Sequence, residues 1–480
     1  MRLSGRIIMD WDTVIGLEVH AELSTQSKIF CSCSTKFGAE PNTQVCPVCC
    51  GMPGALPSLN KSVVDYALRL GLALECDIGE SSVFDRKNYF YPDLPKAYQI
   101  SQLYAPICTN GKMEIEPEGE KATTISIKEI HIEEDAGKLI HANDITLMDY
   151  NRCGVPLLEI VTEPNFSTVA QVVSFLEKLR QTLLYLDICD CKMQEGSMRA
   201  DINLSVRAFG SALGTRTETK NLNSFKAIAR AITHEQKRQI DMLEKGTAIE
   251  QQTRRWDDDR GVSFAMRTKE TAMDYRYFPE PDLLPIIIDK EWINTVAQAL
   301  PELAHKKRER FVKNFGIQQK DAQTITSDKN ICDLFEALIT GTNEPTECAN
   351  LITGDIMRLL KATNTQPENL NIDHKKLAFL IKHLKDKKIN RATYKQVTEE
   401  VFKTDCNPQY FIEKNNLLLT TDPQAMTLAV KEVIAQNQKI VQDYKNGKEK
   451  ALGSLIGQVM KKMQGKAEPV NVRQMLLDNM

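Results

Sequence analysis

A short segment near the N-terminus alternates between apolar and polar residues. In residues 14–22 (VIGLEVHAE), apolar residues occupy every odd position, whereas Glu18, His20 and Glu22 lie at even positions. Because side chains of a strand point alternately to its two faces, the segment is predicted to form a strand with one buried face and one polar face. A carboxylate, an imidazole and a second carboxylate in one row suit a hard metal ion or proton transfer. The alternative is an edge strand whose charges are solvated.

Two later segments have the composition of strands and also carry acids. Residues 125–134 alternate again, with His131 and Glu133 on the polar face, and further acids follow at positions 134 and 135. Residues 155–161 (VPLLEIV) are nearly all apolar, as in a strand buried on both faces, yet they contain Glu159. A carboxylate there needs a metal, another cation or a proton to offset its desolvation. Glu159 is therefore a candidate metal ligand or an acid of raised pKa, with a salt bridge to an arginine as the alternative.

The same periodicities indicate the fold class. Alternation recurs at residues 192–207, and an amphipathic helix is predicted over 168–186. Strands that repeatedly keep one polar face indicate an open antiparallel sheet that forms a polar cradle. After residue 291 the apolar residues follow a helical period, which is most regular over 452–463. We therefore predict an α+β chain with a large N-terminal cradle domain (1–291), an all-α helical domain (292–405) and a small α-helical tail domain (406–480).

Five of the thirteen cysteines fall between residues 31 and 50, and the others are scattered along the chain. Scattered cysteines in a long chain indicate a reduced, cytosolic protein and not a disulfide scaffold. The clustered ones form the pattern C-x-C…C-x-x-C at Cys31, Cys33, Cys46 and Cys49. Four thiolates from two tight turns can close a tetrahedral site, so we predict a structural Zn²⁺, with an iron–sulfur cluster as the alternative. Cys50 is then a spare thiol or a competing ligand.

The composition limits the kinds of partner. A net charge of -3 and a pI of about 6.2 exclude a protein coated in basic surface, so any nucleic acid must be bound by a local patch. One such patch is predicted in the tail, with solvated lysines as the alternative. Its members are Lys445, Lys448, Lys450, Lys461, Lys462, Lys466 and Arg473. No run of about 20 apolar residues suits a membrane span. The first nine residues lack the apolar core of a secretory signal, so we expect a short disordered leader in a cytoplasmic protein, with a transit peptide as the alternative.

Common nucleotide and hydrolase motifs are missing from this sequence. It contains no glycine-rich phosphate loop, no nucleophile elbow and no H-E-x-x-H pair. Residues 84–101 are dense in aromatic and basic residues, which suits nucleotide binding by stacking and charge, or a structural loop pinned by its aromatic residues. If ATP is used, carboxylate-held magnesium and basic side chains must carry its phosphates.

Several long blocks of the sequence are unusual enough to compare with known families. They are VIGLEVH (14–20), FGAEPN (37–42), FDRKNYFYPD (84–93), EEDAGK (133–138), PLLEIV (156–161), KNLNSF (220–225) and DYRYFPEPD (274–282). Together they closely resemble the B subunit of the aspartyl/glutamyl-tRNA amidotransferase. The blocks DYKNGK (443–448) and GQVMK (457–461) resemble the tail domain of that family. The resemblance runs from about residue 12 to the C-terminus, and the helical middle region is its least distinctive part.

The resemblance implies a ligase that forms a carbon–nitrogen bond with glutamine as the amido donor. Family members use ATP to phosphorylate the side-chain carboxylate of mischarged Glu-tRNA(Gln) or Asp-tRNA(Asn), and ammonia then replaces the phosphate. The ammonia comes from glutamine hydrolysed by a partner, the amidase (A) subunit, and the small (C) subunit completes the heterotrimer. In this family the tail domain contacts the tRNA, and some members carry a zinc knuckle. The sequence does not distinguish tRNA(Gln) from tRNA(Asn) as the substrate.

The resemblance also implies site residues. The catalytic residues and Mg²⁺ ligands of the family fall on Glu18, His20, Glu134 and Glu159. Alternation favours Glu133 as the partner of His131, whereas the family motif favours Glu134. We follow the motif here, because strand register often shifts at a strand end, and Glu133 and Asp135 stay open as further ligands. Contacts to phosphate or the acyl ester are expected from Lys87, Lys96, Arg199 and Lys220.

Overall fold

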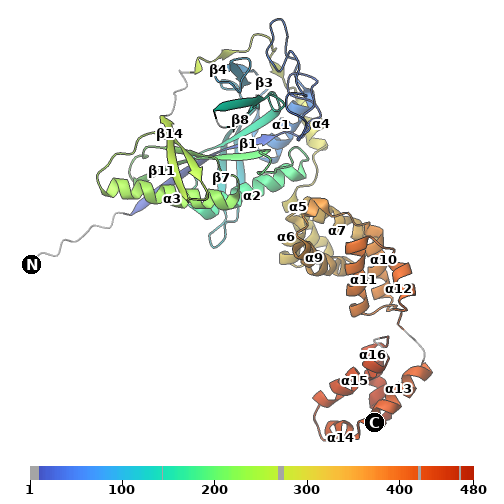
Figure 1. Ribbon diagram of the computed structural model, residues 1–480. Helices are drawn as coiled ribbons and strands as arrows, with labels where there is room; N and C mark the ends of the chain where they lie inside the picture. Colours follow the sequence, from blue (N-terminus) through green and yellow to red (C-terminus); the bar gives the residue numbers. More distant parts are fainter. Residues whose placement is uncertain (1–9, 143, 269–274, 420–422, 464–465) are drawn as a thin grey trace, which may run out of the picture. The chain divides into compact units, whose positions relative to one another are not determined.

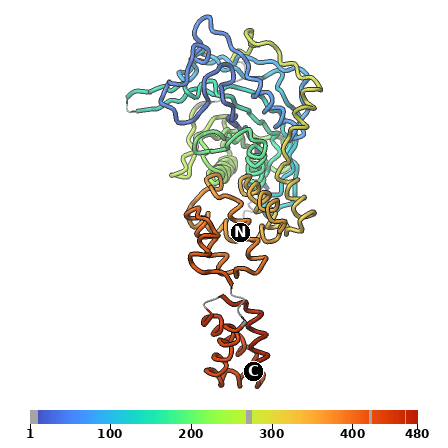
Figure 2. The backbone as a smooth tube through the Cα atoms, turned by 90° about the vertical axis from the view of Figure 1, so that its right-hand side faces the viewer, coloured from blue at the N-terminus to red at the C-terminus, as the bar shows by residue number. Residues whose placement is uncertain are grey.

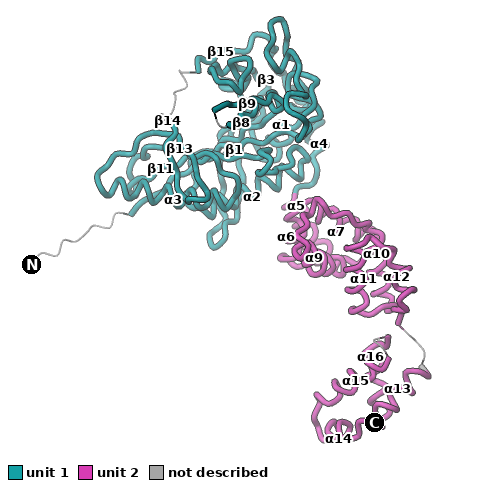
Figure 3. Tube along the Cα trace, in the orientation of Figure 1, with its two compact units in different colours: residues 1–303 teal, residues 304–480 magenta. Residues whose placement is uncertain are grey.

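The computed structural model describes residues 10–142, 144–268, 275–419, 423–463 and 466–480. The expectations for residues 1–9 and for Asp274 therefore lie outside the described residues. The chain divides into two compact units, residues 1–303 and 304–480 (Figure 3). The first unit contains the strands and the second is helical.

A large sheet organises unit 1 (Figure 1). Within the described residues it has nine strands. In spatial order they are β14 (Val262–Thr268), β13 (Gln252–Asp257), β12 (Thr217–Lys220), β11 (Met198–Ala208), β1 (Trp11–Glu22), β10 (Pro156–Thr162), β7 (Thr123–Glu134), β6 (Cys108–Ile115) and β2 (Asp77–Ile78). Neighbours are antiparallel except for β12 and β13, which are parallel. The predicted α+β class with a mainly antiparallel sheet is confirmed.

Strand β1 lies in the middle of this sheet, between β10 and β11. Its apolar residues Ile15, Leu17, Val19 and Ala21 are buried in the main core of unit 1. The predicted period of two is thus confirmed, and the edge-strand alternative is excluded because both sides of the strand are paired.

Helices on one face of the sheet contribute most of the helical part of the core that buries the apolar residues of β1. They are α1 (Lys61–Ala73), α2 (Val169–Tyr185) and α3 (Phe225–Glu244). Helix α2 begins where its sequence predicts, because the Thr168 hydroxyl accepts the backbone N–H of Gln171 and caps the helix. Since these helices pack on the apolar side chains, the polar residues of β1 are left for the opposite face.

Smaller elements surround the sheet. Strand β3 (Ser81–Ser82) pairs with β16 (Ile286–Ile287), and β4 (Asp85–Asn88) lies between β5 (Tyr98–Ser101) and β15 (Phe278–Pro279). Strands β8 (Lys138–Ala142) and β9 (Ile145–Asp149) form a hairpin that extends from the body of unit 1 in Figure 2. Helix α4 (Lys290–Gln298) follows the last strand.

Unit 2 is built from short helices. They are α5 (Ala304–Phe315), α6 (Gln319–Thr326), α7 (Lys329–Thr342), α8 (Pro345–Asn350), the π-helix η2 (Leu351–Ile356), α9 (Met357–Thr363), the 3₁₀-helix η3 (Pro367–Asn369), α10 (His374–Lys385), α11 (Arg391–Thr404), α12 (Pro408–Lys414), α13 (Pro423–Gln436), α14 (Gln438–Lys445), α15 (Lys450–Lys462) and α16 (Pro469–Asn479). Helices α13 to α16 enclose an apolar core of their own, which includes Val430, Leu455 and Leu476. Of the helices in the described ranges, none combines the length and apolar content needed to cross a membrane.

Candidate active site and cysteine site

The polar face of the sheet brings three strands together at one group of acids and imidazoles. In the strand register, His20 of β1 lies opposite Glu159 of β10, which in turn lies opposite His131 of β7. Directly paired residues point to the same face, so these side chains meet. The Nε2 atoms of His131 and His20 lie 2.9 Å and 3.4 Å from Glu159 Oε2. Glu133 joins them, with its Oε1 3.6 Å from His20 Nε2.

The charges of this group are strongly coupled. Burial opposes charge on the imidazole, but the carboxylates of Glu159 and Glu133 outweigh it and raise the pKa of His20 to about 9. Burial likewise opposes charge on Glu159, but His20 and His131 hold its pKa well below the ordinary value. Burial and the charge of Glu159 raise the pKa of Glu133. Two carboxylates and an imidazole this close are a fitting donor set for a divalent cation.

A second acidic group lies on neighbouring strands. Glu18 pairs in register with Asp201 of β11, and Asn203 of β11 pairs with Glu218 of β12. Carboxylate oxygens of Glu18, Asp201 and Glu218 lie within 4.8 Å of one another. Asn203 Nδ2 donates a 2.8 Å hydrogen bond to Glu18, and its buried Oδ1 has no hydrogen-bond partner among the described residues. Lys220 forms ion pairs with both other acids, 3.1 Å to Glu218 and a short contact to Asp201.

A cavity of about 480 Å³ opens beside these groups. Its lining combines acids with basic and aromatic side chains: Glu18, Lys87, Lys128, Glu129, His131, Glu133, Glu159, Asn203, Arg216 and Tyr277. Burial opposes charge on the amine, but Tyr277, Glu133 and Glu159 raise the pKa of Lys87, so the amine is positively charged near neutral pH. Carboxylates for a cation and basic groups for phosphates therefore face one space.

The structure does not bring all of the expected residues to this cavity. The Glu134 carboxylate forms an ion pair with Lys96 and accepts the backbone N–H of Ile100 at 2.9 Å. Its neighbour Glu133 is the acid that reaches His20, because consecutive strand residues point to opposite faces. Alternation along the strand therefore describes this geometry, whereas the family motif led us to the adjacent acid. Lys96 and Glu134 line a smaller cavity, of about 110 Å³, beside the cysteines.

Not all of the expected basic residues lie at the large cavity. Lys87 lines the large cavity, whereas Arg199 donates a 2.7 Å hydrogen bond to Asp135. The sequence patterns did not indicate Asp201, Glu218 or Arg216 as site residues. Alternation along β11 already placed Asp201 on the polar face. The position of Glu218 beside Asp201, however, depends on the register in which β12 pairs with β11. Arg216 lies in the loop before β12, where no periodic pattern applies.

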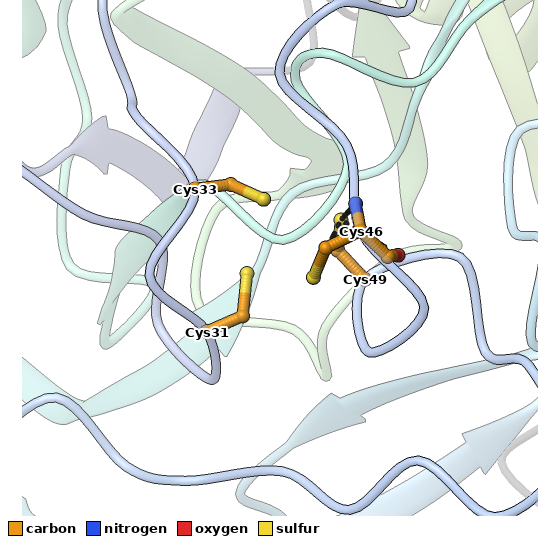
Figure 4. Close-up of side chains that lie close together, drawn as sticks. All are labelled: Cys31, Cys33, Cys46 and Cys49. Atoms are coloured by element: carbon orange, nitrogen blue, oxygen red, sulfur yellow. Dashed lines mark hydrogen bonds between the residues drawn. The ribbon is translucent and has the colours of Figure 1, made fainter.

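The four predicted zinc ligands lie together (Figure 4). The Sγ atoms of Cys31, Cys33, Cys46 and Cys49 all lie within 4.8 Å of one another, and those of Cys46 and Cys49 are 3.9 Å apart. The Cys49 sulfur accepts the backbone N–H of Cys46 at 3.2 Å. A hydrogen bond from Cys31 lowers the pKa of Cys49, and burial of the thiol opposes this shift. The backbone N–H of Cys46 and the charge of Lys28 lower the pKa further, to about 4. The donor set fits Zn²⁺, which prefers four thiolates in a closed structural site.

A largely buried group of carboxylates and imidazoles, of which Glu133, Glu159 and His131 line one cavity together with a charged lysine, indicates an enzyme. Two family descriptions match the chain, the GatB/GatE catalytic domain over residues 13–294 and the GatB domain over residues 333–480. The chain belongs to the GatB family.

Relatives named as the B subunit of aspartyl/glutamyl-tRNA(Asn/Gln) amidotransferase are similar over nearly the full length. The protein of Lachnoclostridium phytofermentans is 53% identical over 469 residues, which cover 97% of this chain and 98% of that protein. The protein of Caldicellulosiruptor bescii is 52% identical over 478 residues, covering 98% and 99%. The protein of Thermoanaerobacter pseudethanolicus is 52% identical over 474 residues, covering 98% and 100%. The resemblance inferred from the sequence blocks is thereby confirmed.

Proposed function

We propose that this chain is the component of a tRNA-dependent amidotransferase that activates and amidates mischarged Glu-tRNA(Gln), Asp-tRNA(Asn) or both. The side-chain carboxylate of the substrate attacks the γ-phosphate of ATP, and ADP leaves. Ammonia then attacks the acyl carbon, inorganic phosphate leaves, and the amide remains on the tRNA. The observation that supports this site most directly is the group of His20, Glu133 and Glu159, of which Glu133 and Glu159 line the 480 Å³ cavity.

The proposal assigns cation binding to the two acidic groups. His20, Glu133 and Glu159 would hold one Mg²⁺ ion, and Glu18, Asp201 and Glu218 would hold another. When bound, Mg²⁺ neutralises phosphate oxygens and so favours phosphoryl transfer. Of the four ligands expected from the family motif, Glu18, His20 and Glu159 are kept. Glu133 takes the place of Glu134, because Glu134 points to the other face of β7, where Lys96 alone neutralises it.

Basic side chains of the cavity are proposed to bind the phosphates of ATP. Lys87 and Arg216 both line it and are proposed to bind phosphate oxygens of ATP. Lys220 holds Asp201 and Glu218 in place through its ion pairs. Lys96 and Arg199 are proposed to position Glu134 and Asp135, since each is engaged with its acid.

The remaining expectations complete the proposal. Ammonia is supplied by the amidase (A) subunit, and the small (C) subunit joins the heterotrimer; the relatives' name, which makes each of them one subunit of a larger enzyme, supports this. The four clustered cysteines hold a structural Zn²⁺. The cradle of residues 1–291 carries the chemistry, residues 292–405 form the helical domain, and residues 406–480 contact tRNA. The reaction takes place in the cytoplasm.

Glu159→Gln tests the assignment of the active site. The variant keeps the shape of the side chain but loses the charge that holds His20 and His131. We expect ATP- and glutamine-dependent amidation, assayed with the partner subunits, to fall by about 100-fold or more while tRNA binding stays within about twofold. Glu114→Gln, an exposed change on β6, is the matched control. Unchanged amidation by Glu159→Gln would overturn the assignment.

A further inference from the structure

Lys28 is a fully buried lysine beside the cysteine group. Lys28 is 0% exposed. Its Nζ atom lies 3.6 Å from Cys49 Sγ and 3.2 Å from the carbonyl oxygen of Tyr150. Its backbone N–H donates to the carbonyl of Cys33, so it begins the turn that carries the first two cysteines. A buried ammonium needs an anion close by to offset its desolvation. The structure therefore raises the question of which anion Lys28 balances.

The carboxylate of Glu134 lies near Lys28 but does not balance its charge. Glu134 lines the same 110 Å³ cavity as Lys28 but forms its ion pair with Lys96. That pair is neutral as a whole. The Tyr150 carbonyl orients the amine but carries no net charge. The Cys49 sulfur is the group in contact with Lys28 that becomes an anion when it binds a metal.

The charge of a site with four thiolates favours a cation nearby. A divalent ion with four thiolates carries an excess negative charge, which is unfavourable in a partly buried site. One charged neighbour at a sulfur atom reduces that excess, and hydrogen bonds to metal-bound sulfur have the same effect. The backbone N–H of Cys46 reaches the same sulfur, at 3.2 Å. Cys49 is thus approached by one N–H and one ammonium group.

We propose that Lys28 is the counter-cation of a tetrathiolate zinc site and strengthens zinc binding through Cys49. It is a positioning residue, because it contacts a ligand and not the metal. The inference rests on the proposed zinc site, and it is independent of the amidation chemistry. Zinc content of the wild-type chain therefore tests the site, and variants of Lys28 test the counter-cation.

The experiment uses the full-length chain and zinc alone as the probe. Zinc content is measured by elemental analysis, and affinity by competition with a chromophoric chelator. We expect Lys28→Met and Lys28→Gln to bind zinc about 10- to 100-fold more weakly, the loss typical of an outer partner of a metal ligand. Lys36→Met, an exposed lysine in the same cysteine loop, should keep the wild-type affinity. Wild-type affinity in folded Lys28→Met would overturn the proposal, and a wild-type chain without zinc would overturn the site itself.

Two further measurements secure the interpretation. If Lys28 acts through Cys49, the effects of Lys28→Met and Cys49→Ser on zinc affinity should be strongly non-additive. Those of Lys28→Met and Cys33→Ser should be closer to additive, and equal coupling at both cysteines would contradict the proposal. If the neutral variants do not fold, Lys28→Arg decides, because it keeps the charge. Zinc affinity within about fivefold of the wild type is then expected, and a larger loss would overturn the proposal.

Discussion

Glu133 and Glu134 are adjacent, both are buried, and their surroundings differ completely. Glu133 lies 3.6 Å from His20 in the large cavity, whereas Glu134 pairs with Lys96 and accepts the N–H of Ile100. Burial therefore does not separate the two acids, but their partners do. Lys96 balances the charge of Glu134 one to one, on the face of β7 opposite the large cavity, so Glu134 is a poor candidate for cation binding there. Lys220 instead shares one positive charge between Asp201 and Glu218, so the second acidic group keeps an excess of negative charge.

Mutation of Glu133 and mutation of Glu134 should affect different properties, the first activity and the second stability. Glu133→Gln should lower ATP-dependent amidation by about 100-fold or more with little loss of stability, because no buried cation is left unpaired. Glu134→Gln should cost about 3–5 kcal/mol of stability, because it leaves Lys96 buried without its partner. Amidation per folded chain and urea unfolding of both variants check this.

The double variant Glu134→Leu/Lys96→Met is the control. It removes both charges together and should recover most of the stability lost in Glu134→Gln. If the double variant is folded and has lost amidation as completely as Glu133→Gln, the catalytic assignment returns to Glu134.

Single strands were predictable from local pattern, but their pairing was not. The period of two in residues 14–22 and the apolar run around Glu159 gave β1 and β10 directly. That His20, Glu159 and His131 lie opposite one another depends on the register of strands far apart in the sequence. Turn chemistry between neighbouring elements does not fix such a register, and tertiary packing does. The site was therefore predictable as residue types on polar faces, and not as two separate acidic groups.

The ends of β1 and β7 bring another acid pair together, with a consequence for pH. Glu22 ends β1, and Asp135 follows β7. Burial, and then the charge of Asp135, raise the pKa of Glu22 from 4.5 to about 8. Between these values the folded chain binds a proton that the unfolded chain has released. This contribution to stability is fully present below pH 4.5 and is lost as the pH rises through about 8.

Glu22→Gln should remove this pH dependence, because its side chain stays neutral. We expect the free energy of unfolding of the variant, relative to the wild type, to rise by about 2–3 kcal/mol between pH 6 and about pH 8.5. Urea unfolding at both pH values measures the difference, and groups common to both proteins cancel. Glu114→Gln, exposed on β6, should run parallel to the wild type. If the free energy of unfolding of Glu22→Gln changes with pH in the same way as that of the wild type, Glu22 ionises normally in the folded chain.

At the scale of the whole molecule, the proposed active site and the proposed tRNA contact fall in different compact units. Both cavities described above are lined by residues of unit 1, whereas the basic residues of the predicted tail belong to unit 2. Two lysines of the tail are already neutralised, Lys448 by Asp443 at 3.0 Å and Lys462 by Glu432. Lys450 and Lys461 are exposed, and neither forms an ion pair with any acid in the described residues. The tail thus offers two kinds of lysine for comparison.

This difference allows a test of the tail in the full-length chain. If the tail binds the phosphate backbone, Lys450→Gln/Lys461→Gln should weaken tRNA binding by about 3- to 10-fold at moderate salt. The slope of the logarithm of the binding constant against the logarithm of the salt concentration should become shallower by about 1–2. Lys448→Gln/Lys462→Gln removes the same number of charges from lysines that acids already neutralise, so its effect should stay below about twofold. Filter binding of tRNA across a salt series measures both. Equal effects of the two double variants would mean that overall charge, and not these unpaired lysines, governs tRNA binding.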